Sequence, residues 1–359
     1  MRKILITAFA VLTTLGAAHA QSPILKVVFP TELGKLPGKP RLHNDHDFTK
    51  EIDVAKAMLK HETAGFTVER GALKSYNIIL AVKHRDKPEI ELVRMEKDGA
   101  NSLGFEIDWE KANGVNTNFI VKVPEGYVVL ANRRVIKLGR YVEAIYTPFT
   151  ANLDTPKMRA NGLAYLQTVL EKAYERAKHV DSEAFPGKTV AEIVPIKVAL
   201  KLAIIEHQDP SRLKTTTIGD LTNEVLTTIG ANRERAYAFA ISTAKARGLF
   251  QFIPRTYAAI RQQYPDAKLH AAFPAGMNDH VNAALASLLL FDSDMRQASP
   301  EQREEMLKDP EKQGGFLAIS YNSGARRAVC WLARGDGCLL PETRDYKRKL
   351  AGVSSFFPY

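Results

Sequence analysis

Glu206 is the residue best placed for acid–base chemistry, because it lies at the end of a strongly apolar segment. Residues 193–207 predict a buried helix. At 100° per residue, one apolar stripe of this helix falls within about 60°, formed by Ile196, Ala199, Leu200, Ala203 and His207. Glu206 flanks the stripe, whereas Lys197 and Lys201 lie on the far side. Burial without a cationic partner raises the pKa of a carboxyl, and a carboxyl that keeps its proton near neutral pH suits general acid catalysis. The alternative is a glutamate at a helix end that faces water.

Three downstream motifs carry residue types that suit sugar binding. They are STAKARGLFQFIP beginning at Ser242, AISYNSG at residues 318–324, and LPETRDY at residues 340–346. Gly248 allows the backbone to approach a ligand closely. Phe250, beside Leu249, offers an apolar wall for a sugar ring, although core packing explains it equally well. Gln251 both donates and accepts hydrogen bonds, as hydroxyl and acetamide groups require.

The last two motifs add polar groups. Tyr321 and Asn322 can orient a sugar or the carboxyl, or they form a capped turn before Gly324. Glu342 and Tyr346 are four residues apart and therefore share one helix face. We expect this pair to line the site or to brace the Tyr321 loop.

The beginning of the chain has the pattern of a Sec-type signal peptide. It starts MRK, is apolar over residues 4–18, and reaches AHA at residues 18–20 before turning polar. The apolar run is shorter than the ~20 residues of a membrane span, no Cys follows for lipid attachment, and no later stretch is long enough to cross a bilayer. We therefore expect an exported protein, periplasmic or secreted, without a transmembrane anchor.

Composition limits the class of protein, and net charge indicates the kind of binding partner. The 359 residues are 45% hydrophobic and 25% charged, which excludes a disordered or collagen-like chain. The net charge of +10 becomes +8 when Arg2 and Lys3 are removed. Such a charge favours an anionic partner. Outside the cytoplasm, the expected anionic partner is the cell wall with its attached acids, and not nucleic acid. The alternative is that the positive charge only keeps the protein soluble.

The order of these segments suggests an α+β protein with a mixed α/β N-terminal domain followed by a mainly α-helical domain. Strands are expected within 75–83, 89–95, 118–123, 127–130 and 141–146, and helices within 53–59, from Thr155 to Ala177, and within 279–296. The expected division is a signal peptide (1–20), an extended arm or linker (21–47), a mixed α/β accessory domain (48–150), a connecting helix (151–185) and the helical domain (186–359).

Taken together, a helix ending in Glu206 and the three motifs in this order resemble the soluble lytic transglycosylase family. The resemblance covers residues 186–350, and it implies a lysozyme-like fold acting on peptidoglycan. It implies that Glu206 is the single catalytic acid and base, cleaving the bond between N-acetylmuramic acid and N-acetylglucosamine with formation of a 1,6-anhydromuramyl end. Substrate contacts are then expected from Ser242, Gly248, Phe250, Gln251, Tyr321, Asn322, Glu342 and Tyr346. Asn282 also matches a family position and is taken as structural.

The sequence departs from the family pattern around Glu206. His207 stands where the family usually has Ser, and a cationic imidazole there would lower the pKa of the acid. Residues 209–235 look like an inserted hairpin or helical flap that covers the site. This insertion leaves Glu224 and Glu234 as alternative acids, and Asp209 and Glu224 as candidates for a second carboxylate. In the middle motif, Lys245 replaces the usual Gly, and Phe250 the usual Met.

Two further signals lie outside these motifs. Cys330 and Cys338, the only cysteines, are expected to form one disulfide in an oxidising compartment. The HNDHD stretch at residues 43–47 contains metal-ligand residue types, but a solvated loop is the favoured interpretation and no metal is assigned.

The sequence thus predicts a lytic transglycosylase that binds peptidoglycan strands, needs no cofactor and binds no nucleic acid. The N-terminal domain is a candidate site for a cell-envelope protein partner. Two alternatives stay open: a hydrolase of the goose-lysozyme type, and a non-catalytic peptidoglycan-binding scaffold with a degenerate site.

Overall fold

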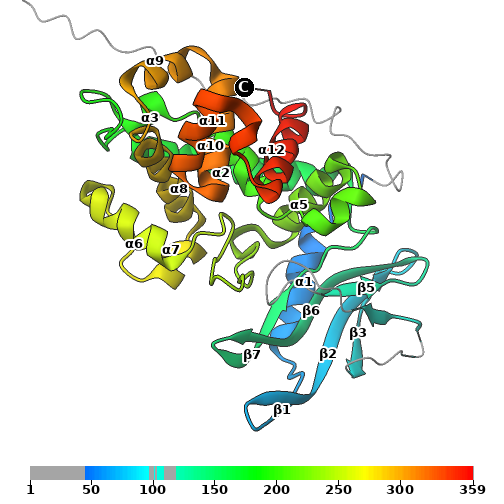
Figure 1. Ribbon diagram of the computed structural model, residues 1–359. Helices are drawn as coiled ribbons and strands as arrows, with labels where there is room; N and C mark the ends of the chain where they lie inside the picture. The colour runs from blue at the N-terminus through cyan, green and yellow to red at the C-terminus, as the bar shows by residue number, and fades with distance from the viewer. Residues whose placement is uncertain (1–44, 97–100, 102, 109–118, 359) are drawn as a thin grey trace, which may run out of the picture. The chain divides into compact units, whose positions relative to one another are not determined.

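The computed structural model describes residues 45–96, 101, 103–108 and 119–358 (Figure 1). The predicted signal peptide and most of the predicted arm lie outside this part of the chain. The described residues contain both helices and antiparallel sheet, so the expected α+β class is confirmed.

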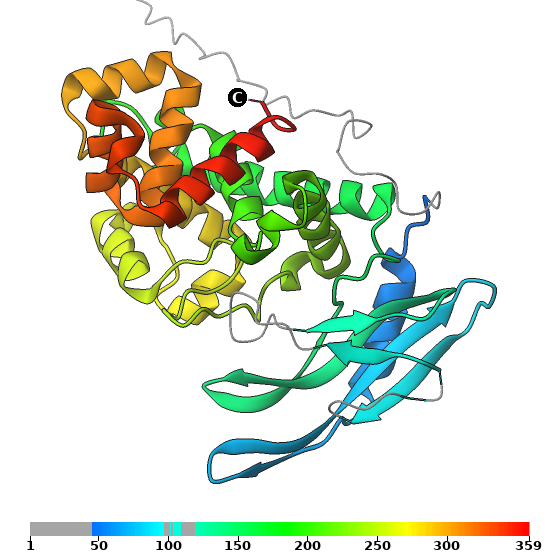
Figure 2. The same ribbon diagram turned by 45° about the vertical axis from the view of Figure 1, so that its right-hand side comes forward.

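The N-terminal portion is an antiparallel sheet with one helix. Four strands follow the order β1-β2-β6-β7, and β3 also pairs with β2, while β4 and β5 form a separate two-stranded sheet. The bounds are α1 Thr49–Lys60, β1 Phe66–Glu69, β2 Ala72–His84, β3 Ile90–Glu96, β4 Glu106–Asp108, β5 Ile120–Lys122, β6 Tyr127–Leu138 and β7 Arg140–Tyr146. Helix α1 packs on one face of the sheet through Ile52, Ala55 and Leu59, which are all fully buried. Figure 2 shows this helix lying along the strands.

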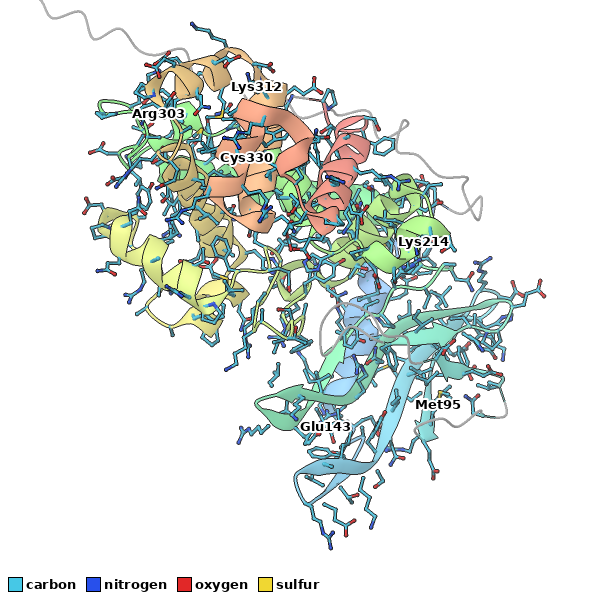
Figure 3. The ribbon with its side chains drawn as sticks, viewed as in Figure 1. Met95, Glu143, Lys214, Arg303, Lys312 and Cys330 are labelled. Atoms are coloured by element: carbon cyan, nitrogen blue, oxygen red, sulfur yellow. A yellow bond between two sulfur atoms is a disulfide. The ribbon has the colours of Figure 1, made fainter. Side chains whose placement is uncertain are left out.

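Strand β6 is much longer than the expected 127–130, and two arginines explain the difference. Arg133 and Arg134 interrupt the apolar pattern on which the prediction depended. Arg133 donates to Leu59 O at 2.9 Å and pairs with Glu143 of β7, which is labelled in Figure 3. Arg134 lies over the ring of Phe119 at 4.6 Å. Because both cations have partners, the strand continues through them.

Residues 150–358 are mainly helical. The bounds are α2 Pro156–Ala177, α3 Val190–Ile193, α4 Ile196–Ile205, α5 Ile218–Asn232, α6 Pro254–Gln263, α7 Phe273–Asn278, α8 His280–Met295, α9 Pro300–Lys308, α10 Pro310–Ser323, α11 Ala325–Arg334 and α12 Pro341–Ser354. Short 3-10 turns occur at Pro210–Lys214, Arg233–Arg235, Pro265–Ala267 and Gly335–Cys338. Helix α2 begins as predicted, with the side chain of Thr155 accepting from Met158 N at 3.1 Å and Pro at the first position.

Helix α4 is central to the helical part. Its residues are apolar all around apart from two lysines, and a helix of that kind is stable only when it is buried. It contacts α2, α5, α8, α10 and α12. The end of α4 is therefore held by several neighbours at once, and Glu206 follows immediately.

The predicted boundary at residue 150 does not interrupt the hydrophobic core. One buried cluster joins Ile79 and Leu130 of the sheet to Leu153, Met158 and Ala231 of the helical part. Thr147 N also donates to Asn232 Oδ1 at 2.9 Å.

Candidate active site around Glu206

Glu206 caps the C-terminal end of α4. Its backbone N–H donates to Leu202 O at 3.0 Å, so it still has helical geometry. The chain cannot continue as a helix past Asp209, because Asp209 precedes Pro210 and a residue before proline disfavours the helical conformation. Glu206 is partly accessible to solvent, as a proton donor to an external substrate has to be.

Helix α12 supplies two groups to this end of α4. The hydroxyl of Tyr346 donates to Glu206 Oε1. Three residues later, Lys349 Nζ donates to Gln208 O and to Ile205 O, the latter at 3.4 Å. Carbonyls at a helix C-terminus lack partners within the helix, and a lysine there satisfies them; Ile205 O also accepts from Gln208 N at 3.3 Å. One face of α12 thus fixes both the carboxyl and the backbone that carries it.

The surroundings favour the protonated form of Glu206. Desolvation is the largest effect and raises its pKa, whereas the Tyr346 hydrogen bond and the Lys349 charge lower it. The net result is a pKa of about 7. The carboxyl therefore exchanges a proton near neutral pH, the property expected of a general acid that later acts as a base.

His207 does not counteract this effect, contrary to the concern raised by the sequence. Desolvation lowers the pKa of His207 to about 3, so the ring is neutral at neutral pH. Its Nε2 lies 3.0 Å from Leu249 O, and its ring stacks on Tyr237 with centroids 3.4 Å apart. A neutral imidazole that donates to a carbonyl positions the 248–251 turn and adds no charge beside Glu206.

The 248–251 turn is tight and depends on Gly248. This glycine has φ +73°, and a Cβ atom there would lie 2.7 Å from Met277 O. The side chain of Gln251 donates to Gly248 O at 2.8 Å, and Gln251 itself has φ +47°. Phe250 is fully buried. Its ring belongs to the core and offers no surface to a sugar, whereas its carbonyl accepts a hydrogen bond from Tyr321.

Tyr321 links this turn to the carboxyl. Its hydroxyl, on α10, donates to Phe250 O. Burial is the main reason that the pKa of Tyr321 lies well above its ordinary value, and the negative charges of Glu206 and Asp294 add to this. The structure thus brings Tyr321, Tyr346 and the 248–251 turn to Glu206.

The other predicted contact residues have structural roles in the described chain. Ser242 Oγ accepts from Ala246 N at 3.0 Å and closes a turn. Thr343 Oγ1 donates to Asn322 Oδ1 at 2.9 Å and joins α12 to the last turn of α10, where a loop was expected. Thr343 thus makes this contact, while its neighbour Glu342 is exposed. Asn282 is buried and donates to Tyr257 Oη at 2.9 Å, a structural role as expected.

Residues 209–235 are not a flap over the site. Most of this segment is α5, whose apolar side chains Leu221, Leu226 and Ile229 are buried. It packs so tightly on α2 that a Cβ at Gly162 would lie 1.9 Å from Leu226 O. This segment therefore adds a core helix.

The alternative carboxylates are less suited to the role. Both oxygens of Glu224 lie 2.7 Å from Arg212 Nη1, so this carboxylate is already engaged in an ion pair. Glu234 is exposed. Asp209 Oδ1 accepts from Ser211 N at 2.8 Å in its own turn.

Sequence reasoning missed Lys349 and Asp294. Burial raises the pKa of Asp294 on α8 to about 6, and its charge acts on Tyr321. Neither residue has a sequence signal of its own, because each reaches the site only through helix packing. Lys349 is recognisable only afterwards, as the residue three positions beyond Tyr346.

Cys330 and Cys338 form the predicted disulfide, which closes the loop after α11; Cys330 is labelled in Figure 3. Of the HNDHD stretch, the first two residues lie outside the described chain, while His46 pairs with Glu51 at 2.7 Å. Within the described ranges, no group of three or more His, Cys, Asp or Glu side chains could hold a metal ion. No helix among those residues has both the length and the apolar character to span a bilayer.

Comparison with known proteins returns no match: no family model, no curated protein and no solved structure is significantly similar to this chain.

Proposed function

We propose that the protein is a peptidoglycan lytic transglycosylase with Glu206 as its general acid and base. The observation that carries the proposal is one partly accessible carboxyl whose pKa is raised to about 7 at the end of a buried helix. The order of the motifs around Tyr321, Tyr346 and the 248–251 turn supports it. The helical part is accordingly proposed to be a lysozyme-like domain.

The proposed reaction uses one carboxyl twice, first as an acid and then as a base. Protonated Glu206 donates to the glycosidic oxygen, and the bond from this oxygen to the muramyl C1 breaks. The carboxylate that results accepts the proton of the muramyl C6 hydroxyl, whose oxygen forms a new bond to C1. The products are a 1,6-anhydromuramyl end and a free hydroxyl on the leaving sugar, and no water is consumed. One carboxyl suffices for both steps, in contrast to the pair used by most glycosidases.

The neighbours of Glu206 each have a role in this scheme. Tyr346 holds Oε1 and leaves the other carboxyl oxygen to exchange the proton. Lys349 fixes the backbone carbonyls beside the acid, and its charge stabilises the carboxylate formed after proton donation. His207 and Tyr321 hold the 248–251 turn through adjacent carbonyls. Such fixed geometry is what positioning of a sugar against a proton donor requires.

The location follows from the proposed activity and the pattern at the chain's start. We propose that residues 1–20 direct export and that the mature chain, with a charge of +8, acts on the anionic wall outside the cytoplasm. The sheet-containing part then either positions the glycan or binds a cell-envelope partner.

Mass analysis of muropeptides released from purified cell walls tests the proposal. The wild type is expected to produce anhydro ends, and Glu206→Gln to produce none. Glu304→Gln is the matched control, because it makes the same change at an exposed position of α9, outside the motifs. Reducing ends, heavier by one water, would indicate the goose-type hydrolase. Wall binding without any soluble product would indicate the scaffold.

A further inference from the structure

Residues 235–265 form a basic segment with an unusual charge composition. These 31 residues contain no Asp or Glu, although at the chain's average of 40 acidic residues in 359 about three would be expected. The segment does contain five cations, which are Arg235, Lys245, Arg247, Arg255 and Arg261.

These five charges are not neutralised inside the protein. None of them forms an ion pair with a carboxylate of the described chain. Arg235 lies over the ring of Phe239 at 5.0 Å. Arg247 is partly buried and the other four are exposed. Unpaired cations on one continuous segment create a local positive potential that attracts anions.

Two of the cations lie next to the proposed active site. Arg247 immediately precedes Gly248, and its backbone pairs with both Ile241 and Phe252. Leu249 and Phe250, two and three residues further on, supply the carbonyls that bind His207 and Tyr321. With ~3.8 Å between consecutive Cα atoms, the backbone of Arg247 lies within about 8 Å of that of Leu249.

Lys245 is positioned by its own turn. Its N–H donates to Ser242 O at 2.9 Å, and its φ of +64° is a conformation that a lysine rarely adopts. The turn therefore fixes the backbone of Lys245, whose side chain is exposed, two residues before Arg247. Arg255 and Arg261, in contrast, lie on α6, beyond the turn.

We propose that Lys245 and Arg247 bind carboxylate groups of the substrate, so that the site selects glycan strands that carry peptide stems over bare glycan. This proposal rests on the proposed function, in which the substrate is peptidoglycan. The stems present carboxylates near the muramyl sugar at which Glu206 acts. A guanidinium binds a carboxylate through two parallel hydrogen bonds, and an ammonium group adds a second positive charge.

The test compares two glycans, one with intact stems and one from which an amidase has removed them. The readout is the ratio of their cleavage rates. We expect a ratio of about ten in the wild type, equivalent to about 1.4 kcal/mol. In Lys245→Asn/Arg247→Gln the ratio should fall to about one. Asn suits the positive φ at position 245, and Arg247→Lys should retain part of the ratio.

The control is Arg255→Gln/Arg261→Gln, which removes the same charge from the same segment but at α6. Its ratio should stay within about twofold of the wild type. A double variant at 245 and 247 that keeps the wild-type ratio would overturn the proposal, and so would a control that loses the ratio to the same extent.

A binding measurement tests carboxylate recognition independently of the proposed catalytic activity. Equilibrium binding of both glycans is measured with Glu206→Gln as the background, where no cleavage is expected. Tighter binding of the stem-bearing glycan that depends on residues 245 and 247 supports carboxylate recognition even if the wild type cleaves nothing. Equal binding of the two glycans refutes it even if the wild type cleaves both.

Discussion

The substitution Glu206→Gln is expected to abolish cleavage and, at alkaline pH, to make the protein more stable. An exposed glutamate has a pKa of 4.5, whereas that of Glu206 is about 7. At about 1.4 kcal/mol for each tenfold change in proton affinity, the difference amounts to about 3 kcal/mol. Because Glu206 is partly accessible to solvent, this figure is an upper value.

The sign follows from proton binding. Below pH 4.5 the carboxyl is protonated in both the folded and the unfolded chain, and contributes no difference. Between pH 4.5 and 7 the folded chain keeps a proton that the unfolded chain has lost, so the free energy of unfolding falls as pH rises. Above pH 7 the folded chain carries the full cost of a desolvated carboxylate. Glutamine is neutral throughout and avoids this cost.

Urea unfolding at pH 4, 6 and 8 measures the effect. The variant should match the wild type at pH 4 and exceed its free energy of unfolding by up to about 3 kcal/mol at pH 8. The exposed Glu304→Gln should show no such trend. In the same preparations, release of soluble muropeptides should fall at least about 100-fold in Glu206→Gln, the lower range for loss of a general acid.

A different pH dependence would refute the reasoning. If Glu206→Gln is less stable than the wild type at pH 8, then Glu206 is ionised in the folded protein and stabilised by Lys349 and Tyr346. A carboxylate of that kind cannot donate a proton at neutral pH, and the acid role would have to be abandoned. Stability equal at all three values of pH would show that the carboxyl is not desolvated.

Three further changes have calculable results. Tyr346→Phe removes a hydrogen bond that lowers the pKa of the Glu206 carboxyl. The alkaline limit of the pH–rate profile should therefore move upward, while unfolding in urea at pH 7 becomes easier by about 1 kcal/mol. Gly248→Ala should lower the melting temperature more than Gly324→Ala. Both glycines have positive φ, but only at position 248 would a Cβ atom lie against Met277 O. Equal decreases in melting temperature would contradict this. Cys330 and Cys338 are eight residues apart, and the entropy of closing a loop of that length is worth about 2.5 kcal/mol. Reduction of the disulfide should therefore lower the free energy of unfolding by about that amount. A urea midpoint unchanged by reductant would contradict this.

The sequence predicted those elements whose formation depends on a local pattern. Helix α4 is apolar around its whole circumference, so its burial did not depend on knowing its neighbours. Thr155 and Pro156 marked the start of α2, and Asp279 that of α8. In each case the cap residue satisfies backbone groups within its own first turn.

The sequence could not predict contacts made by distant segments. Lys349 reaches the end of α4 across more than 140 residues, and only the packing of α12 on α4 brings the two together. Residues 209–235 have the turn residues of a flap, but their apolar stripe finds a partner in α2 and becomes core. Phe250 likewise had two equally good interpretations until its surroundings were known.

Backbone strain gives an independent reason to locate function beside Glu206. Six non-glycine residues of the described chain have positive φ, and three of them, Tyr237, Lys245 and Gln251, fall within 15 residues. Such conformations cost about 1–3 kcal/mol each and persist only where surrounding contacts hold them. Here the stack of His207 on Tyr237 and the Gln251 hydrogen bond to Gly248 are such contacts. A loop that only closed the core would need neither the strain nor the desolvated carboxyl beside it. The strained backbone and the desolvated carboxyl each lower the stability of the fold, and they occur in the same place. A site shaped for a ligand explains this better than the requirements of folding do.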